Sequence, residues 1–376
     1  GRPPARRAVT GGIGILPVMA GRSGGGPETY ERALVHGLAR LDPGQRYEVL
    51  CLNAAAARVL SPGGNVRTTV LPGHFRPLAM TAGLAWGLWR CRVDFLHAAY
   101  IAPPVSPVPY VFTLHCSSPF MRPDFFPAAI RRRLLFLLAR GMRDARHVIA
   151  VSQNVKDFAV AHYRVDPGRI TVVHNGVGAH FRPVAPAAAA PVLARHGLPA
   201  RFVFCAARFE KRKNLDGALR AFAHLHRVDP GLRLVIAGDM SWEKARLDGV
   251  IDALGLRGAV VLPGYIPNED LPAVYSACLF FAYPSLWEGF GIPVLEAMAC
   301  GAPVLSSAVT SIPEVAGDAA LLVDPASDDA LRAGFLALGT DAGLRARLAA
   351  AGPARAALFG WDRCAAETLA VYRRFA

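Results

Sequence analysis

The sequence predicts an α/β fold with two doubly wound parallel sheets, one in each half of the chain. Short apolar runs of strand length alternate with amphipathic helical segments in both halves, which is the pattern of repeated βαβ units. Between the halves, the segment 181–191 contains three prolines and a run of alanines, and we expect it to be a linker. A chain of 376 residues, 53% of them hydrophobic, can bury two separate cores.

The first half begins with an apolar run at 13–19, a glycine loop at 21–29 and a helical pattern at 30–41. Each later strand is a short apolar run that ends at turn-forming residues, and the helix at 78–92 ends in cations, as the helix dipole favours. We expect further strands at 47–52, 66–71, 94–98, 110–114, 147–151 and 170–173. We expect further helices at 78–92, 130–142 and 154–163.

The second half repeats the alternation of strands and helices. Its strands are expected at 201–206, 233–237, 260–262, 279–283, 303–306 and 320–323. Its helices are expected at 216–226, 242–254, 270–278, 294–300 and 328–338. After an irregular stretch at 352–360, the chain ends in an amphipathic helix at 361–375. The expected domains are therefore 1–183 and 184–358, followed by a final helix at 359–376.

The formal net charge is +14, and nearly all of the cations are arginine. No zinc-finger, helix-turn-helix or aromatic-studded basic motif accompanies them, so we expect no nucleic-acid partner. The positive charge could serve to bind an anionic membrane surface or a pyrophosphate-linked acceptor. The alternative is that the arginines are simply spread over solvated faces of the protein. The helices at 78–92 and 130–142 could lie on a membrane through apolar faces with basic edges, or be core helices with snorkelling arginines.

The seven cysteines form no C-x-x-C pair, which is typical of a reduced, cytoplasmic protein without a cysteine metal site. No segment reaches 18 uncharged apolar residues, and no secretory signal pattern follows the basic start. We therefore expect a cytoplasmic location, with peripheral contact to the inner membrane as an addition.

The most informative stretch is 282–307, AYPSLWEGFGIPVLEAMACGAPVLSS. It predicts a strand, a glycine-broken loop, a helix and a second strand, with Pro293 in the first helical turn and Gly301 after the last. Such a loop aims the free N–H groups of a helix at a ligand above it, usually a phosphate. Glu288 and Glu296 bracket the loop, and we expect Glu296 in the first turn of the helix and Glu288 just before it. Both can accept sugar hydroxyls. The pattern predicts a nucleotide-sugar site, although acids near a helix start are also common without a ligand.

Together with 311–325, SIPEVAGDAALLVDP, this stretch resembles the E-x7-E signature of retaining GT-B-fold glycosyltransferases of family 4, also called glycosyltransferase group 1, in its bacterial mannosyltransferase-like branch. The resemblance implies two Rossmann-like domains that face a central cleft, and a last helix that returns to the N-terminal domain. It implies that Glu288 meets hydroxyls of the donor sugar and Glu296 holds the nucleotide ribose. The connecting loop would approach the donor through Gly289, Phe290, Gly291 and Ile292.

Arg208 and Lys213 lie just past a predicted strand, in AARFEKRKN. Two cations there can offset the charge of a pyrophosphate and stabilise the leaving group. A solvated basic loop is the plainer interpretation, but the resemblance implies that an arginine and a lysine at these positions bind the donor phosphates. Arg212 is adjacent and could substitute for Lys213.

Gly25 and Gly26 of the first glycine loop would let the backbone approach a donor phosphate closely. His115 ends the apolar run 110–114, and the resemblance implies that it meets the donor sugar near the anomeric carbon. An aspartate often follows that histidine in the family, whereas this chain has Cys116.

Four further positions have smaller expected roles. The resemblance implies that the loops containing Gly238, Tyr265 and Ile266 frame the nucleotide base. Ser152 follows a predicted strand, and we expect it to cap the next helix rather than bind a ligand.

The function that these patterns predict is retaining transfer of a hexose, most simply mannose from GDP-mannose, to a glycan or lipid-linked oligosaccharide. A UDP-sugar donor and a GT-B-fold nucleotide-sugar epimerase are the alternatives. No Asp-x-Asp motif stands at a strand end, so we expect no metal and no cofactor besides the donor. The assigned catalytic residues are Glu288, His115, Arg208 and Lys213.

Overall fold

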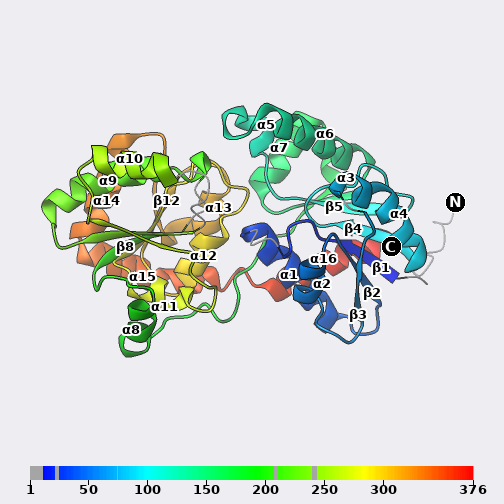
Figure 1. Cartoon of the computed structure of the whole chain (residues 1–376), viewed down its shortest axis with the longest axis horizontal. Helices are drawn as coiled ribbons and strands as arrows, with labels where there is room; N and C mark the ends of the chain where they lie inside the picture. Colours follow the sequence, from blue (N-terminus) through cyan, green and yellow to red (C-terminus); the bar gives the residue numbers. More distant parts are fainter. Residues whose placement is uncertain (1–11, 22–24, 74, 207–209, 239–243, 376) are drawn as a thin grey trace. The chain divides into compact units, whose positions relative to one another are not determined.

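The computed structural model describes residues 12–21, 25–73, 75–206, 210–238 and 244–375, and Figure 1 shows their arrangement within each half. The chain divides into two compact units. Unit 1 comprises Gly1–Gly176 and Trp361–Ala376, and unit 2 comprises Val177–Gly360. Each unit contains its own parallel sheet with helices packed on it.

The sheet of unit 1 has seven parallel strands in the order β3-β2-β1-β4-β5-β6-β7. The register places Ile13 of β1 beside Tyr47 of β2 and Phe95 of β4. The order reverses between β1 and β4, and parallel sheets bind ligands outside the carboxyl ends of the strands at such a point. The strands are β1 (Gly12–Leu16), β2 (Tyr47–Cys51), β3 (Val66–Val70), β4 (Val93–Ala98), β5 (Tyr110–Leu114), β6 (His147–Ala150) and β7 (Ile170–Val172).

The helices of unit 1 include the last helix of the chain, α16 (Trp361–Phe375), which packs against α1 (Gly26–Leu41). Tyr372 of α16 is buried against Phe95, and its hydroxyl lies 2.5 Å from Nδ1 of His97. The other helical segments are α2 (Ala54–Val59), α3 (Arg76–Leu78), a π-helical turn (Ala79–Gly83), α4 (Leu84–Arg90), α5 (Ser118–Met121), α6 (Ala128–Asp144) and α7 (Gln153–Tyr163). Among the described residues, no helix is both long and apolar enough to cross a membrane.

The sheet of unit 2 has six parallel strands in the order β10-β9-β8-β11-β12-β13, so its order reverses between β8 and β11. The strands are β8 (Phe202–Ala206), β9 (Arg233–Ala237), β10 (Val260–Gly264), β11 (Phe280–Tyr283), β12 (Val304–Ser307) and β13 (Leu321–Val323). The helices are α8 (Pro186–Arg195), α9 (Leu215–Val228), α10 (Lys244–Ala253), α11 (Leu271–Ala277), α12 (Ile292–Ala299), α13 (Ile312–Ala316), α14 (Asp328–Thr340) and α15 (Ala342–Ala356).

Two expectations about irregular segments are wrong. Most of 181–191 is not a linker, because α8 begins at Pro186 and its alanines favour the helix. Ala189 is buried, and α8 packs on α11. The stretch 352–360 is helical as far as Ala356, because α15 packs closely on α12: a Cβ added to Gly352 would lie 2.9 Å from the Met298 carbonyl oxygen.

The two helices with a possible membrane role differ in exposure. In the segment 78–92, Leu84 and Leu88 are buried in the core, and Trp89 is exposed. In α6 the buried residues lie in its last two turns, whereas Ile130 and Phe136 are 46% and 58% exposed. The first helix therefore has a buried face and also exposes Leu78 and Trp86, and in the second the core interpretation holds only for the end.

Candidate active site

The loop between β11 and α12 brings the two predicted carboxylates to the reversal point of the second sheet. Gly291 caps α12 with a φ of +104°, and a Cβ there would lie 2.5 Å from the Ile312 side chain, so only glycine fits. Pro293 lies in the first turn, as predicted. The Ser311 hydroxyl is 3.1 Å from the carbonyl oxygens of both Glu288 and Phe290, which fixes the loop from the side of α13.

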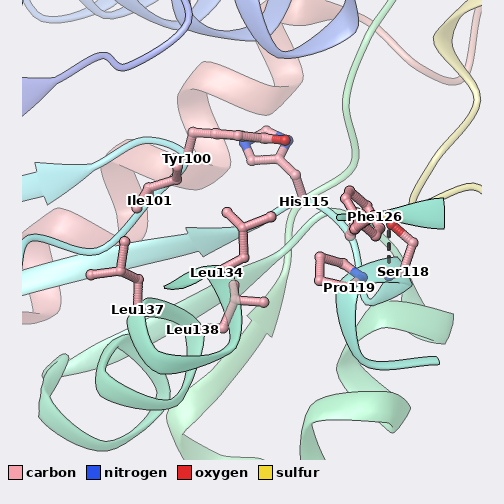
Figure 2. A pocket seen from close by; sticks show the side chains of 10 residues that line it. Tyr100, Ile101, His115, Ser118, Pro119, Phe126, Leu134, Leu137 and Leu138 are labelled. Atoms are coloured by element: carbon pink, nitrogen blue, oxygen red, sulfur yellow. Dashed lines mark hydrogen bonds between the residues drawn. The ribbon is translucent and has the colours of Figure 1, made fainter. Parts of the chain in front are cut away.

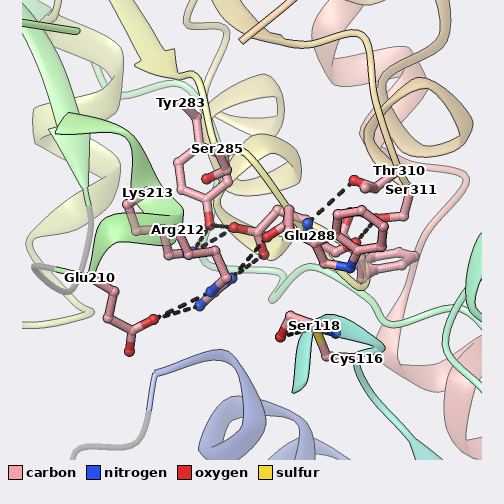
Figure 3. A network of polar contacts seen from close by, with 12 residues as sticks. Cys116, Ser118, Glu210, Arg212, Lys213, Tyr283, Ser285, Glu288, Thr310 and Ser311 are labelled. Carbon is pink, nitrogen blue, oxygen red and sulfur yellow. Dashed lines mark hydrogen bonds and ion pairs between the residues drawn. The ribbon is translucent and has the colours of Figure 1, made fainter. Parts of the chain in front are cut away.

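Glu288 is held by three side chains, one from the last residue of β11 and two from the turn that follows β8 (Figure 3). The Lys213 ammonium donates to its Oε1 over 2.7 Å, and the Tyr283 hydroxyl donates to the same oxygen over 3.0 Å. Arg212 Nη1 lies 2.9 Å from Oε2. Lys213 also donates to the Tyr283 hydroxyl. Glu288 is only 7% exposed, so its carboxylate is a buried anion that is paired with two cations.

The charge state of this group follows from its neighbours. Burial by itself would raise the pKa of Glu288, but Arg212 and Lys213 outweigh it and lower that pKa to about 2. Burial, together with the nearby Arg212, lowers the pKa of Lys213, and Glu288 acts in the opposite direction. Glu288 is therefore an ionised hydrogen-bond acceptor across the physiological pH range.

Arg212 and Lys213, the two candidate cations of the basic loop after β8, both contact Glu288. Lys213 is buried against Glu288, and Arg212 bonds Glu288, the Trp287 carbonyl oxygen at 3.3 Å and Glu210 at 3.0 Å. Arg212 therefore accompanies Lys213 instead of replacing it. Arg208 lies outside the described residues.

Glu296 has the opposite electrostatic character. It lies in the second turn of α12, because the helix begins at Ile292, and not in the first turn as expected. Its Oε2 accepts a hydrogen bond from the Tyr275 hydroxyl over 3.1 Å. Burial raises the pKa of Glu296 to about 7, against the lowering effect of the Tyr275 bond. The two acids of the motif therefore differ: one is permanently charged and the other titrates near neutral pH.

Thr310 and Tyr283 are site residues that sequence reasoning missed. The Glu288 N–H donates to the Thr310 hydroxyl over 3.3 Å, and Thr310 has a φ of +60°. A β-branched residue in the left-handed region costs on the order of 1–3 kcal/mol, so the surrounding structure must impose it. Nothing in the sequence predicts the left-handed backbone conformation of Thr310. Tyr283 could have been predicted from the sequence, because it is a tyrosine at the last position of the strand that leads into the acidic loop.

The residues expected to frame the base follow two neighbouring strands. Gly238 comes directly after β9, and Tyr265 and Ile266 come directly after β10. The Gly238 N–H donates to the Gly264 carbonyl oxygen over 2.8 Å, and both glycines have a positive φ, of +147° and +84°. Tyr265 is 68% exposed, whereas Ile266 is buried. The two loops therefore meet, and among Gly238, Tyr265 and Ile266 the tyrosine is the one that presents an accessible side chain.

The glycine turn and the histidine belong to unit 1. Gly25 caps α1 with a φ of +66° and open space where a Cβ would lie, and Gly26 begins the helix. Three backbone N–H groups of the preceding turn, those of Val18, Met19 and Ala20, donate to the buried carboxylate of Glu31. This arrangement fixes the path of the chain as it leaves β1.

His115 follows β5 and is held by its neighbours. Its Nε2 donates to the Ala99 carbonyl oxygen over 2.8 Å, and its ring packs edge-on against Tyr30. Burial lowers the pKa of His115 to about 4, so the imidazole is neutral. The Cys116 thiol donates to the Ser118 hydroxyl over 3.1 Å, in the position where the family often has an aspartate.

Two serine hydroxyls support local structure, and that of Ser152 confirms the expected helix cap. The Ser152 hydroxyl accepts the Val155 N–H over 3.2 Å and caps α7. The Ser307 hydroxyl donates to the Ser285 carbonyl oxygen over 2.6 Å, which braces the start of the acidic loop. Within the described ranges, no three His, Cys, Asp or Glu side chains form a group that could hold a metal ion.

Two family models match the chain, and together they cover most of both units. The model of the glycosyl transferases group 1 matches residues 195–355, and the model of glycosyltransferase family 4 matches residues 24–181. An O-antigen chain mannosyltransferase B of Escherichia coli is 32% identical over 292 residues, which are 77% of this chain and 76% of that protein.

Two further matches show the range of the family. A D-inositol 3-phosphate glycosyltransferase of Acidothermus cellulolyticus is 37% identical over 56% of this chain and 49% of its own length. A solved structure of Anabaena Alr3699/HepE in complex with UDP and glucose superposes with a TM-score of 0.76 at 22% identity, over 96% of this chain and 99% of that one. With the two parallel-sheet units, that superposition confirms the GT-B fold. The chain therefore belongs to the glycosyl transferases of group 1.

Proposed function

We propose that this protein is a retaining mannosyltransferase that moves mannose from GDP-mannose to a glycan or lipid-linked oligosaccharide. Its membership in the family supports glycosyl transfer, and its similarity to an O-antigen chain mannosyltransferase supports mannose and a polysaccharide acceptor. The observation that carries the proposal is the buried, ionised Glu288, fixed by Lys213, Arg212 and Tyr283 where the second sheet reverses its strand order.

The proposed chemistry uses charges that are already in place. Glu288 accepts hydroxyls of the donor sugar and orients it, while Lys213 and Arg212 balance the charge that develops on the leaving diphosphate. The N-terminus of α12 adds partial positive charge to the same loop. The bond between the anomeric carbon and the phosphate oxygen breaks, and the acceptor oxygen bonds to the anomeric carbon on the same face of the sugar. The departing phosphate oxygen takes the proton of that acceptor hydroxyl. No protein nucleophile and no metal enter this scheme.

Glu296 is proposed to bind the nucleotide ribose. Its pKa of about 7 lets the carboxylate ionise when two ribose hydroxyls become available as donors. Tyr275 already donates to one of its oxygens, which leaves the ribose the remaining acceptor positions. The exposed ring of Tyr265 is proposed to lie beside the base.

A donor screen by thermal shift tests the donor assignment. GDP-mannose, UDP-glucose and ADP-glucose are compared at equal concentrations, and GDP-mannose is expected to raise Tm the most, because a ligand stabilises only the state that binds it. NMR of the product should show the anomeric configuration of the donor, and turnover should persist in EDTA. An inverted product would refute the retaining mechanism.

A UDP-sugar is the second donor candidate, because the Anabaena structure that shares this fold contains UDP and glucose. A larger shift with UDP-glucose than with GDP-mannose would favour it. An epimerase would convert the nucleotide-sugar without any acceptor, so incubation with the donor alone distinguishes that activity from transfer.

We further propose that the protein works on the cytoplasmic membrane face as a peripheral protein. The exposed start of α6 supports this proposal, because Arg132 and Arg133 stand beside the exposed Ile130 and Phe136. Liposomes containing anionic lipid should carry the wild-type chain upward in a flotation gradient. Arg132→Glu with Arg133→Glu should remain at the bottom, and equal flotation of both proteins would refute the contact.

A further inference from the structure

Unit 1 has an open hollow that His115 helps to line, and the proposed donor chemistry does not use its apolar side. Figure 2 shows it between the segment after β4, the short helix α5 and the helix α6. The apolar residues that line it are Ile101, Pro119, Phe126, Leu134, Leu137 and Leu138. A site for a sugar alone would be lined mostly by hydrogen-bonding groups, and this one is not.

Helix α6 provides the apolar wall. Leu134 and Leu137 are three residues apart and therefore lie on the same face, toward the hollow. Both are only half-buried, so the hollow leaves apolar surface in contact with water. Phe136, on the same helix, is 58% exposed and does not line the hollow. An apolar ligand would remove the two leucines from water without touching Phe136.

The lining of the hollow also has a polar part. His115 and Ser118 line it at the carboxyl end of β5, together with the ring of Tyr100. The lining is thus amphipathic, with neutral hydrogen-bonding groups near the carboxyl end of β5 and hydrocarbon along α6. A ligand that fits it has a polar portion joined directly to an apolar chain.

A cation is bonded to one of the lining residues. Arg131 lies one turn before Leu134, and its Nε donates over 3.0 Å to the carbonyl oxygen of Pro119, which lines the hollow. Arg132 and Arg133 follow it and are exposed. A guanidinium held in this way matches the oxygen geometry of a phosphate.

We propose that this hollow binds the first part of the hydrocarbon chain of an acceptor whose chain ends in a phosphate, with the phosphate at Arg131. The role as an acceptor site rests on the proposed function, and it narrows the acceptor class to lipid phosphates or diphosphates. The chain binding itself depends only on the described residues of unit 1.

Octyl phosphate is the probe, titrated below its micelle concentration into the full chain by calorimetry, with methyl phosphate for comparison. One saturable site is expected, at least tenfold tighter for octyl phosphate, because each buried methylene is worth up to about fourfold in affinity. Leu137→Gln should weaken it at least tenfold, and the matched control Phe136→Gln should not. Arg131→Gln should abolish the preference for octyl phosphate over 1-octanol.

Three results would overturn the proposal: no saturable binding, equal binding of methyl and octyl phosphate, or loss in Phe136→Gln with retention in Leu137→Gln. The last pattern would mean that the chain binds the outer face of α6, as a membrane surface would. Circular dichroism melting of each variant shows that it is folded. The calorimetric titration contains no nucleotide-sugar, so it is independent of the donor screen. If the GDP-mannose screen fails and octyl phosphate still binds, the proposed function is rejected and the hollow remains a binding site for an alkyl phosphate.

Discussion

At the scale of single residues, the site depends on one buried carboxylate and the groups that keep it charged. Glu288 receives hydrogen bonds from Lys213 and Tyr283 and an ion pair from Arg212. Removing the charge of this buried anion leaves the buried Lys213 without its counter-ion, whereas Arg212 keeps Glu210, so the effects on binding and on stability are coupled.

Glu288→Gln should lower kcat by at least ~100-fold, because a neutral amide orients the donor sugar less strongly and no longer offsets Lys213 and Arg212. Steady-state kinetics with the preferred donor measures this effect. Thermal melting of the same variant controls for unfolding, and Asp124→Asn, on an exposed turn of unit 1, is a control for carboxylate removal. Full turnover by folded Glu288→Gln would disprove the assigned role.

Thr310→Val should destabilise unit 2 by about 1 kcal/mol, because it removes the hydroxyl that accepts the Glu288 N–H and leaves the shape of the side chain unchanged. Thr310→Ser keeps the hydroxyl and serves as the matched control. Urea unfolding gives the free energies, and kcat should fall only in the valine variant. If both variants behave alike, the hydroxyl does not position Glu288.

At the scale of elements, the packing of α16 on α1 is the contact that sequence periodicity could not locate. Gly37 of α1 faces Ala365 of α16, and a Cβ on Gly37 would lie 2.6 Å from the Cβ of Ala365. The two helices therefore approach as closely as they do because one side of the contact has no side chain.

Gly37→Ala should destabilise unit 1 by about 1–3 kcal/mol, because overpacking outweighs the gain in helix propensity. Ala365→Gly in the same protein should restore most of that stability, since it removes the facing methyl group. Thermal melting of the single and double variants measures the coupling. Additive losses in the double variant would show that the two positions do not touch.

At the scale of the whole molecule, two buried acids make stability depend on pH. The folded-state pKa values of Glu31 in unit 1 and Glu296 in unit 2 are both raised to about 7, chiefly by burial. The folded protein then binds more protons than the unfolded chain between the ordinary glutamate pKa and about 7. Each acid therefore lowers stability as pH rises through this window and has no further effect above it.

Glu296→Gln should remove the part of this pH dependence that arises in unit 2. The free energy of unfolding of the variant, relative to that of wild type, should increase by on the order of 1–3 kcal/mol between about pH 4.5 and pH 7. Urea unfolding at several pH values measures the difference. Glu31→Gln is the matched comparison in unit 1. A constant difference between wild type and Glu296→Gln over that pH range would mean that Glu296 keeps an ordinary pKa in the folded state.

The sequence by itself determined the alternation of strands and helices, the acidic glycine loop and the helix that starts at it. These features depend on local rules: apolar periodicity, the fixed φ of Pro293 and the positive φ open to Gly291. It also placed Lys213 and Glu288 in the segments that follow two strands, and a parallel sheet then brings such residues together where its order reverses.

Only the tertiary structure decided which groups surround Glu288, how Glu296 is buried and that 186–195 and 342–356 are helices. Thr310 shows why: its left-handed backbone is unfavourable locally and is imposed by contacts with a loop 22 residues away. Charge states and strained conformations depend on the sum of distant neighbours, and that sum exists only after the chain has folded.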